Sequence, residues 1–154
     1  MLNPDFRDML FALSEERVEF LLVGAYAMAV HGMPRATGDL DIWIRPEAGN
    51  ADRLMRALGR FGAPLDSITA GDFSQPNLVF QIGVVPRRLD LLTSIDGVDF
   101  EAAWKRRELV SIDDVEVPVL SLPDLKVNKR AVGRLRDLAD VEALEALEDD
   151  RLPS

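Results

Sequence analysis

The segment between Val23 and Ile44 constrains the fold more than any other part of the chain, because it combines a glycine turn with an alternating strand pattern. Residues 40–44 alternate apolar and other side chains, which is typical of a β-strand. That strand turns three apolar residues to one face and three other residues to the opposite face: Leu40, Ile42 and Ile44, and Asp39, Asp41 and Trp43. Two neighbouring carboxylates repel each other unless a cation or water surrounds them. The pattern therefore predicts a strand that is buried on one face and attracts cations on the other.

A third acidic residue occurs in a second strand pattern, residues 88–92. Two leucines of this strand would face the core, and Asp90 would face the opposite side. If the two strands are neighbours, Asp39, Asp41 and Asp90 converge on one patch. The chain has no cysteine and one histidine, so a zinc site is not expected and oxygen-ligated magnesium is favoured. We expect the three acids to bind two magnesium ions, or manganese, and to act in phosphoryl transfer.

Gly24 follows an apolar strand pattern at residues 19–23 and precedes a segment of high helix propensity at residues 25–31. Backbone N–H groups at such a strand-to-helix turn attract anions, and glycine lets a phosphate come close. The Asp-x-Asp pair alone is equally well explained by a solvated surface pair. The order of strand, glycine, helix, loop, Asp-x-Asp strand and later acidic strand favours a phosphate site instead.

The rest of the chain alternates predicted helices and strands. The helices cover residues 4–17, 50–61, 100–105 and a segment from Pro123 that breaks at Gly133, and the strands cover residues 78–85 and 115–120. A last helix over residues 135–147 would bury four apolar side chains, Leu138, Val141, Leu144 and Leu147. Residues 148–154 are expected to form a frayed acidic tail. We predict one α/β (α+β) domain over residues 1–154, with a small mixed sheet flanked by helices in residues 18–122 and further helices in residues 123–148.

Composition limits the classes of function. The 154 residues are 47% hydrophobic and 29% charged, with a formal net charge of -9. An acidic chain repels polyphosphate, which disfavours a simple DNA- or RNA-binding module but not an enzyme with metals or a local basic patch. The sequence shows neither a signal peptide nor an apolar run long enough for a membrane span. We therefore expect a cytoplasmic protein without membrane contact.

Three motifs together resemble the nucleotidyltransferase superfamily with a DNA-polymerase-β-like core: Val23-Gly24-Ala25, Asp39-Leu40-Asp41 and Asp90. The chain is more closely similar to small bacterial nucleotidyltransferases related to the abortive-infection toxin group. That similarity rests on further residues, namely His31-Gly32, Arg35, Thr37, Lys129, Gly133, Arg134, Asp137, Leu138 and Asp140. It spans residues 20–147, which is nearly the whole chain.

The resemblance implies a nucleotidyltransferase fold and the transfer of a nucleoside monophosphate from an NTP to a hydroxyl group, with release of pyrophosphate. The acceptor would be RNA such as tRNA, a protein or a small molecule. The resemblance implies Asp39, Asp41 and Asp90 as catalytic metal ligands. It also implies a nucleotide-binding set formed by Gly24, Ala25, Arg35, Thr37, Lys129 and Arg134. Asp137 would orient Lys129 or Arg134.

Ala25 departs from the family pattern, which has Gly or Ser at this position. Without the serine hydroxyl, weaker NTP binding is expected. The alternative function is a weakly catalytic or non-catalytic partner protein of a toxin–antitoxin system, which would bind a cognate toxin or antitoxin. A carboxylate-metal phosphodiesterase or nuclease is a second alternative, which the Gly24 turn and the lack of clustered histidines disfavour.

Several other residues have structural explanations. His31 is expected to cap a helix or bind a loop, Trp43 to pack beside the cleft or stack on a base, and Trp104 to lie in the core. Two basic groups are expected to be surface charge, Arg87-Arg88 and Lys105-Arg106-Arg107. One larger basic cluster is either a clamp on the triphosphate or a solvated helix with ion pairs to Asp124, Asp137 and Asp140. This cluster comprises Lys126, Lys129, Arg130, Arg134 and Arg136.

Overall fold

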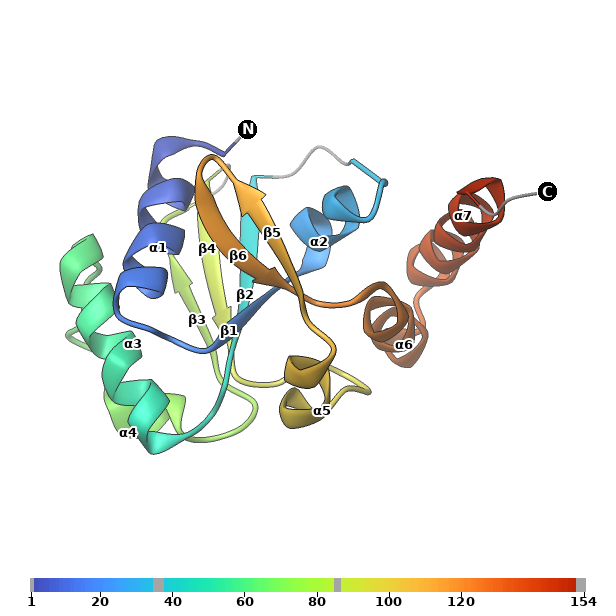
Figure 1. Ribbon diagram of the computed structural model, residues 1–154. Coiled ribbons are helices and arrows are strands. Elements are labelled where there is room, and N and C mark those ends of the chain that lie inside the picture. Colours follow the sequence, from blue (N-terminus) through green and yellow to red (C-terminus); the bar gives the residue numbers. More distant parts are fainter. Residues whose placement is uncertain (1, 35–37, 85–86, 152–154) are drawn as a thin grey trace.

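A six-stranded mixed β-sheet forms the centre of the protein in the computed structural model, which describes residues 2–34, 38–84 and 87–151 (Figure 1). The strand order is β3-β4-β2-β1-β6-β5. The strand bounds are Phe20–Val23 (β1), Asp39–Ile44 (β2), Val79–Ile82 (β3), Arg88–Leu92 (β4), Glu108–Ile112 (β5) and Val115–Val119 (β6). β2 runs antiparallel to β1 and parallel to β4, while β6 runs parallel to β1. The predicted small mixed sheet is confirmed.

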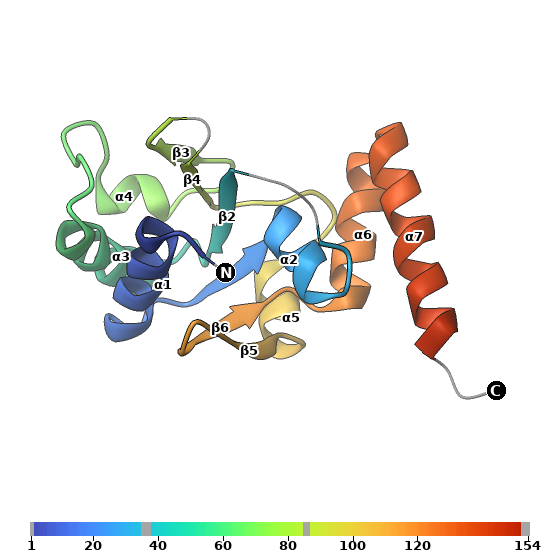
Figure 2. The ribbon, with the colours of Figure 1, turned by 90° about the horizontal axis from the view of Figure 1, so that it is seen from above.

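Helices cover both faces of this sheet. Their bounds are Pro4–Glu15 (α1), Gly24–Val30 (α2), Ala48–Phe61 (α3), Ala70–Phe73 (α4), Phe100–Lys105 (α5), Leu122–Val132 (α6) and Leu135–Arg151 (α7). Figures 1 and 2 show α1, α3 and α4 together on one side of the sheet and α2 on the other side. In both views α6 and α7 lie side by side beyond α2, as the part of the molecule farthest from α1 and α3.

The apolar core fills the space between the sheet and the layer of α1 and α3. Apolar side chains recur in α1 at helical spacing, and four of them are almost completely buried: Phe6, Met9, Leu10 and Leu13. The helix begins where the side chain of Asn3 accepts a hydrogen bond from the backbone N–H of Phe6 at 3.0 Å. On β2 the alternation predicted from the sequence is present, because Leu40, Ile42 and Ile44 are fully buried. The acidic residues of β2 are thereby turned to the opposite face, towards α2.

The C-terminal helices differ in part from the prediction. Ser121 caps α6, and Gly133 ends it in the left-handed conformation with φ +73°, so the predicted break is confirmed. The predicted frayed tail is wrong for residues 148–151, which continue α7, and its residues 152–154 lie outside the described part of the chain. Leu138 was predicted to be buried, yet 43% of its surface is exposed. The reason is that α7 packs on α6 rather than on the sheet (Figure 2), so its buried stripe is narrow and is centred on Val141 and Leu144.

Two short elements had no counterpart in the prediction. β5 is an edge strand whose residues are all exposed or half-buried, so it lacks the fully buried positions that mark a strand in sequence. α4 is a single turn, held by a capping box between Thr69 and Asp72. The predicted strand at residues 78–85 is shorter in the structure and ends at Ile82. No described helix combines the length and the apolar character needed to cross a bilayer.

Candidate active site

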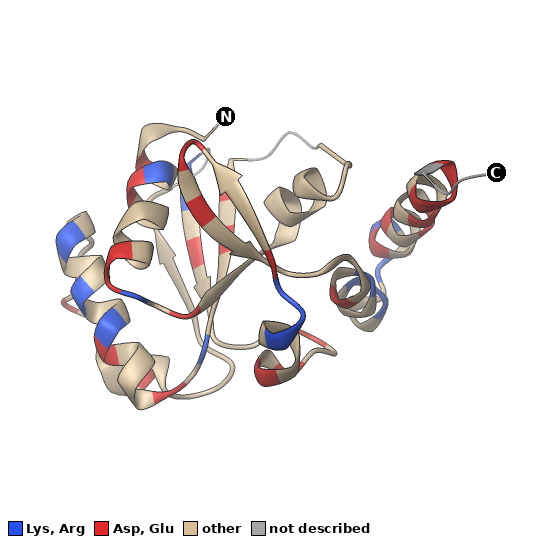
Figure 3. Cartoon of the chain, in the orientation of Figure 1, with Lys and Arg blue, Asp and Glu red and all other residues tan. Residues whose placement is uncertain are grey.

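The three predicted acids lie on adjacent strands. In the parallel pair of β2 and β4, Asp41 is directly opposite Asp90, and Asp39 is opposite Arg88. On its other side Asp41 is opposite Val23, the last residue of β1. The structure therefore brings Asp39, Asp41 and Asp90 to one patch of the sheet. Figure 3 shows acidic residues on the central strands, whereas the other acidic residues lie mainly on helices and turns.

Asp41 has an unfavourable environment for a charged carboxylate. Its burial raises the pKa to about 7, and the negative charges of Asp90 and Asp39 act in the same direction. A hydrogen bond with the Asp90 carboxyl also raises this pKa, while the guanidinium of Arg88 lowers it. Asp41 is thus a carboxylate that lacks sufficient positive charge around it. A site of this kind is stabilised by a proton or by a cation.

Arg88 provides the positive charge that the structure does contain. Its Nε donates a hydrogen bond to Asp90 Oδ1 at 2.8 Å, and its Nη2 donates to Asp39 Oδ2 at 3.0 Å and to Asp90 Oδ2 at 3.2 Å. The prediction that Arg88 is surface charge is wrong, since only 27% of its side chain is exposed. The sequence did carry a signal. Arg88 precedes Asp90 by two residues on one strand, and this spacing places both on the same face.

Gly24 lies close against Asp41 of the acidic patch. Its backbone has φ +67°, and a Cβ added there would lie 2.2 Å from Asp41 Oδ2. Any side chain at this position would therefore clash with Asp41, and the left-handed backbone would also be strained. Val23 precedes α2 without a side-chain cap, so the first N–H groups of the helix are left for another partner. The structure thus explains why a glycine stands where the phosphate seat was predicted.

A cleft of about 340 Å³ joins this patch to α6 and α7. Its lining comprises Gly24, Ala25, Met28, Asp39 and Asp41 on one side and Lys129, Arg134, Arg136, Asp137 and Asp140 on the other. Six predicted site residues are therefore in one cavity: Gly24, Ala25, Asp39, Asp41, Lys129 and Arg134. Asp90 lies just outside the lining and is connected to it through Asp41. Two predicted nucleotide-binding residues, Arg35 and Thr37, lie outside the residues that the structure describes.

The basic wall of the cleft is held by two buried carboxylates. Lys129 Nζ lies 2.9 Å from Asp140 Oδ2 and 3.5 Å from Asp137 Oδ1. Arg134 donates to both oxygens of Asp137, at 2.6 Å from Nε and 3.3 Å from Nη2. The hydrogen bond from Arg134 lowers the pKa of Asp137, with Lys129 acting in the same direction. The ion pairs of the second interpretation are present for Lys129 and Arg134, which also line the cleft, and the clamp on the triphosphate stays a prediction.

Asp140 was predicted only as an ion-pair partner and Arg136 only as a member of the basic cluster, yet both line the cleft. Asp140 follows Asp137 by three residues, a spacing that places both on one face of α7. That spacing could have indicated a shared role, but only the fold shows that this face is turned towards the acids of the sheet. Arg136 lies next to Asp137 in sequence and reaches the cleft from the first turn of α7.

The donor chemistry of the acidic patch fits a hard divalent cation. Three carboxylates supply oxygen ligands, and the close approach of Gly24 leaves backbone N–H groups rather than a side chain beside Asp41. In the arrangement described, no group of three or more His, Asp or Glu side chains among the described residues is placed to hold a metal ion. The guanidinium of Arg88 lies in this patch and is bound to oxygens of Asp39 and Asp90 that a cation would need.

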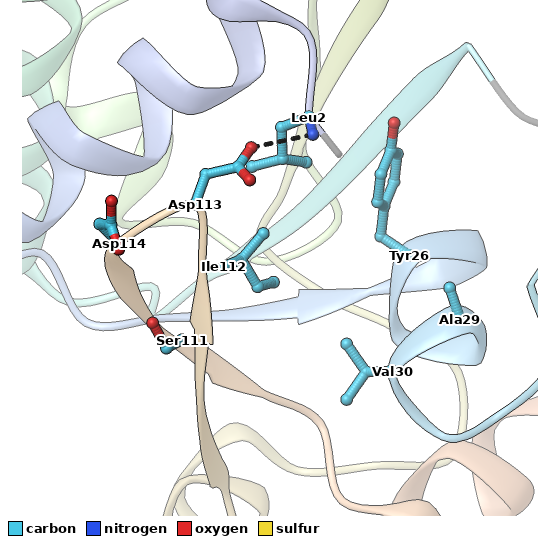
Figure 4. Close-up of a pocket in the computed structure, with 8 residues that line it drawn as sticks. All are labelled: Leu2, Tyr26, Ala29, Val30, Ser111, Ile112, Asp113 and Asp114. Carbon is cyan, nitrogen blue, oxygen red and sulfur yellow. Dashed lines mark hydrogen bonds between the residues drawn. The ribbon is translucent and has the colours of Figure 1, made fainter.

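A larger cavity of about 650 Å³ lies along another side of α2 (Figure 4). It is lined by Leu2, Tyr26, Ala29, Val30, Ser111, Ile112, Asp113 and Asp114. Figure 4 shows Tyr26 facing the turn at Asp113, whose carboxylate accepts a hydrogen bond from the Leu2 N–H at 3.0 Å. None of its lining residues is basic, and none belongs to the acidic patch. The smaller cleft is therefore the better candidate for phosphate chemistry.

Three other predicted residues have structural positions. His31 ends α2, and its Nε2 lies 2.8 Å from the carbonyl oxygen of Leu120, so it joins a helix end to the chain after β6. Trp43 is buried and packs edge-on against Phe100, with 4.9 Å between the ring centroids. This packing excludes base stacking by Trp43. Trp104 is half-buried at the margin of the core, where it stacks on Phe100.

No family model and no curated protein sequence matches the chain. Solved structures do match over nearly its full length. One is a Thermotoga maritima protein, TM1012, provisionally described as a nucleotidyltransferase, which is 19% identical to this chain. The match covers 98% of this chain and 97% of that protein, with a TM-score of 0.59. The lincosamide antibiotic adenylyltransferase LnuA with lincomycin bound is 15% identical, with coverage of 94% and 97% and the same TM-score. The antibiotic-resistance factor ANT(2'')-Ia is 14% identical, with coverage of 96% and 90% and a TM-score of 0.52.

These matches show that the chain has the fold of known nucleotidyltransferases, as the sequence motifs predicted. The relation to the abortive-infection group is not tested by them and stays a prediction.

Proposed function

We propose that this protein is a metal-dependent nucleotidyltransferase that moves a nucleoside monophosphate from an NTP to a hydroxyl group and releases pyrophosphate. One observation carries the proposal. A single cleft has the Asp39–Asp41 pair and Gly24 on one wall and Lys129 and Arg134 on the other. Metal-binding acids facing phosphate-binding cations are what transfer from a triphosphate requires. The nucleotidyltransferase fold supports the same assignment.

The three acids would hold the divalent ions, for which we propose magnesium, with manganese as a substitute. Asp39 and Asp41 line the cleft, and Asp90 pairs with Asp41 across the strands. Bound there, such ions neutralise negative charge on the reacting phosphate and on the attacking and leaving oxygens. The raised pKa of Asp41 is consistent with this assignment, because the carboxylate sits in a place that lacks positive charge.

Different residues around the cleft would act on different parts of the substrates. The uncapped N–H groups at the start of α2, beside Gly24 and Ala25, would donate hydrogen bonds to the phosphate chain. Lys129 and Arg134 would bind the distal phosphates, which become the leaving pyrophosphate. Asp90 would accept the proton of the acceptor hydroxyl. β4 lies on the far side of β2 from β1, so Asp90 is on the side of the acids away from the α2 turn.

The acceptor is the open part of this proposal. LnuA is an adenylyltransferase whose structure contains lincomycin, so a small molecule is one class to test. RNA such as tRNA and proteins remain candidates, although the net charge of -9 disfavours a long nucleic acid backbone. Ala25 supports the alternative of a weakly catalytic or non-catalytic partner in a toxin–antitoxin pair, because no hydroxyl is available beside Gly24.

The test is incubation of the protein with each of the four NTPs, labelled at the α-phosphate, in magnesium or manganese. Each mixture would contain tRNA, total cellular protein or a panel of small alcohols and antibiotics. We expect label to move to one acceptor class with wild-type protein and not with Asp41→Asn. The matched control is Asp52→Asn, which changes an exposed acid on α3 outside the cleft. Absence of NTP binding by folded wild-type protein in both metals would refute the proposal.

A further inference from the structure

We infer that Asp140 is a positioning residue, which holds the ammonium group of Lys129 at the wall of the cleft where the distal phosphates of an NTP bind. The inference rests on the proposed function. It gives a functional role to a residue that the sequence identified only as an ion-pair partner, and it separates the tasks of the two carboxylates on α7. Asp140 acts on Lys129, whereas Asp137 acts mainly on Arg134.

The distances support this division. Lys129 Nζ is 2.9 Å from Asp140 Oδ2, a good hydrogen-bond length for an ion pair. Its distance to Asp137 Oδ1 is 3.5 Å, at the outer limit of a hydrogen bond. Asp137 instead receives two hydrogen bonds from Arg134, the shorter at 2.6 Å. Lys129 and Arg134 thus each have one principal carboxylate partner.

Burial makes the pairing of Lys129 and Asp140 strong enough to fix a side chain. Only 13% of the Lys129 side chain and 7% of the Asp140 side chain are exposed. A buried carboxylate is costly unless it is paired, and a free lysine side chain samples many rotamers. The pair joins α6 to α7, and its lysine lines the same cleft as Asp39 and Asp41. A ligand then meets a cation that is already in place.

Two physical effects predict opposite results when the charge of Asp140 is removed. If Asp140 acts only by repelling phosphates through its negative charge, Asp140→Asn removes that charge from the cleft, and polyphosphate should bind more tightly. If Asp140 positions Lys129, the same substitution releases the ammonium and polyphosphate should bind more weakly. The direction of the change therefore distinguishes positioning from electrostatics, and a general loss of structure can be checked separately.

The probe is inorganic tripolyphosphate with magnesium, measured by calorimetry, because it carries the phosphates without choosing a base. We expect Asp140→Asn to raise the dissociation constant about tenfold, the size of one charged hydrogen bond. Lys129→Ala should raise it at least as much, and Asp140→Asn should add little in the Lys129→Ala background. AMP, which lacks distal phosphates, should show a much smaller change in every variant.

The matched control is Glu148→Gln. Glu148 accepts a hydrogen bond from Lys126 at 2.5 Å, so this pair also joins α6 to α7 through a lysine and a carboxylate. Neither residue lines the cleft. Glu148→Gln should therefore lower the free energy of unfolding, because it weakens a contact between α6 and α7. Tripolyphosphate binding should stay at the wild-type level.

Tighter or unchanged binding by Asp140→Asn would overturn the inference, as would an equal loss in the Lys129→Ala background. If wild-type protein binds neither tripolyphosphate nor any NTP, the proposed function fails together with it. If wild-type protein binds both and Asp140→Asn binds equally well, only the positioning role fails. Should Asp140→Asn not fold, Asp140→Glu is used instead. It keeps the charge but moves the carboxylate, and it should weaken binding several-fold, so wild-type affinity in that variant would also overturn the inference.

Discussion

Asp41→Asn is expected to make the metal-free protein more stable at pH 8, although it removes a residue proposed to be essential for transfer. Burial raises the pKa of Asp41 to about 7, with further contributions from Asp90 and Asp39. In the unfolded chain an aspartate has a pKa of about 3.9. The folded state therefore favours the protonated form, and ionisation of Asp41 at high pH costs stability. Asparagine has a similar shape and carries no charge.

The size of the effect follows from the difference between the two pKa values. About three pH units at about 1.4 kcal/mol each give an upper limit of roughly 4 kcal/mol. This cost is absent below pH 4, grows as the pH rises from about 4 to 7, and is constant above that range. Local relaxation and water entry lower such penalties, so we expect roughly 1–3 kcal/mol. For a chain of this size that corresponds to an increase in Tm of roughly 3–8 °C.

The assay is thermal unfolding followed by circular dichroism in EDTA, at pH 4 and at pH 8. Asp41→Asn should gain stability at pH 8 and show little gain at pH 4. Asp39→Asn is the matched control, because the Asp39 side chain is 33% exposed and receives one hydrogen bond from Arg88. Its effect should stay within about 1 kcal/mol. Equal stability of Asp41→Asn and wild type at pH 8, or an equal gain at both pH values, would refute the reasoning.

Three further substitutions test the same site. Gly24→Ala should lower the free energy of unfolding by at least about 2 kcal/mol, because the new Cβ meets Asp41 Oδ2 at 2.2 Å on a backbone with φ +67°; an unchanged denaturant midpoint would show that the turn has room. Ala25→Ser should tighten NTP binding several-fold by adding one hydroxyl donor, worth about 0.5–1.5 kcal/mol, as measured by calorimetry; weaker binding would place the phosphates elsewhere. Arg88→Ala should strengthen manganese binding several-fold in the absence of nucleotide, since a competing cation is removed; unchanged affinity in a manganese titration would show that Arg88 does not compete.

The acidic patch was predictable because strand geometry is local. Alternation alone assigned Asp41 to the face opposite Leu40 and Ile42, and the same rule placed Asp90 on its own strand. The parallel pairing that brings the two together is a long-range fact, which the sequence indicated only through the family motif. Arg88 was assigned to the surface although the alternation rule applies to it equally, so that error lay in not using an available signal.

The C-terminal helices were less predictable for a physical reason. A hydrophobic pattern predicts which face of a helix could be buried, but not how much of that face a neighbour covers. α7 packs on one helix, so Val141 and Leu144 are buried while Leu138 remains exposed. Likewise, Asp140 is an ordinary acidic residue in sequence, and its burial beside Lys129 depends on how α6 and α7 cross. Edge strand β5 escaped prediction because none of its residues is fully buried.

If the proposed function holds, Arg88 would make metal loading an exchange rather than an addition. A guanidinium already neutralises part of the acidic patch, so the proposed function does not require a divalent ion to be present while the chain folds. Folding and metal uptake are then separate events, in contrast to small domains whose structural metal must be present for them to fold. An entering ion would compete with the guanidinium of Arg88, which stays beside the acids at a constant local concentration. Occupancy of the proposed site would thereby depend on the free ion concentration of the surroundings.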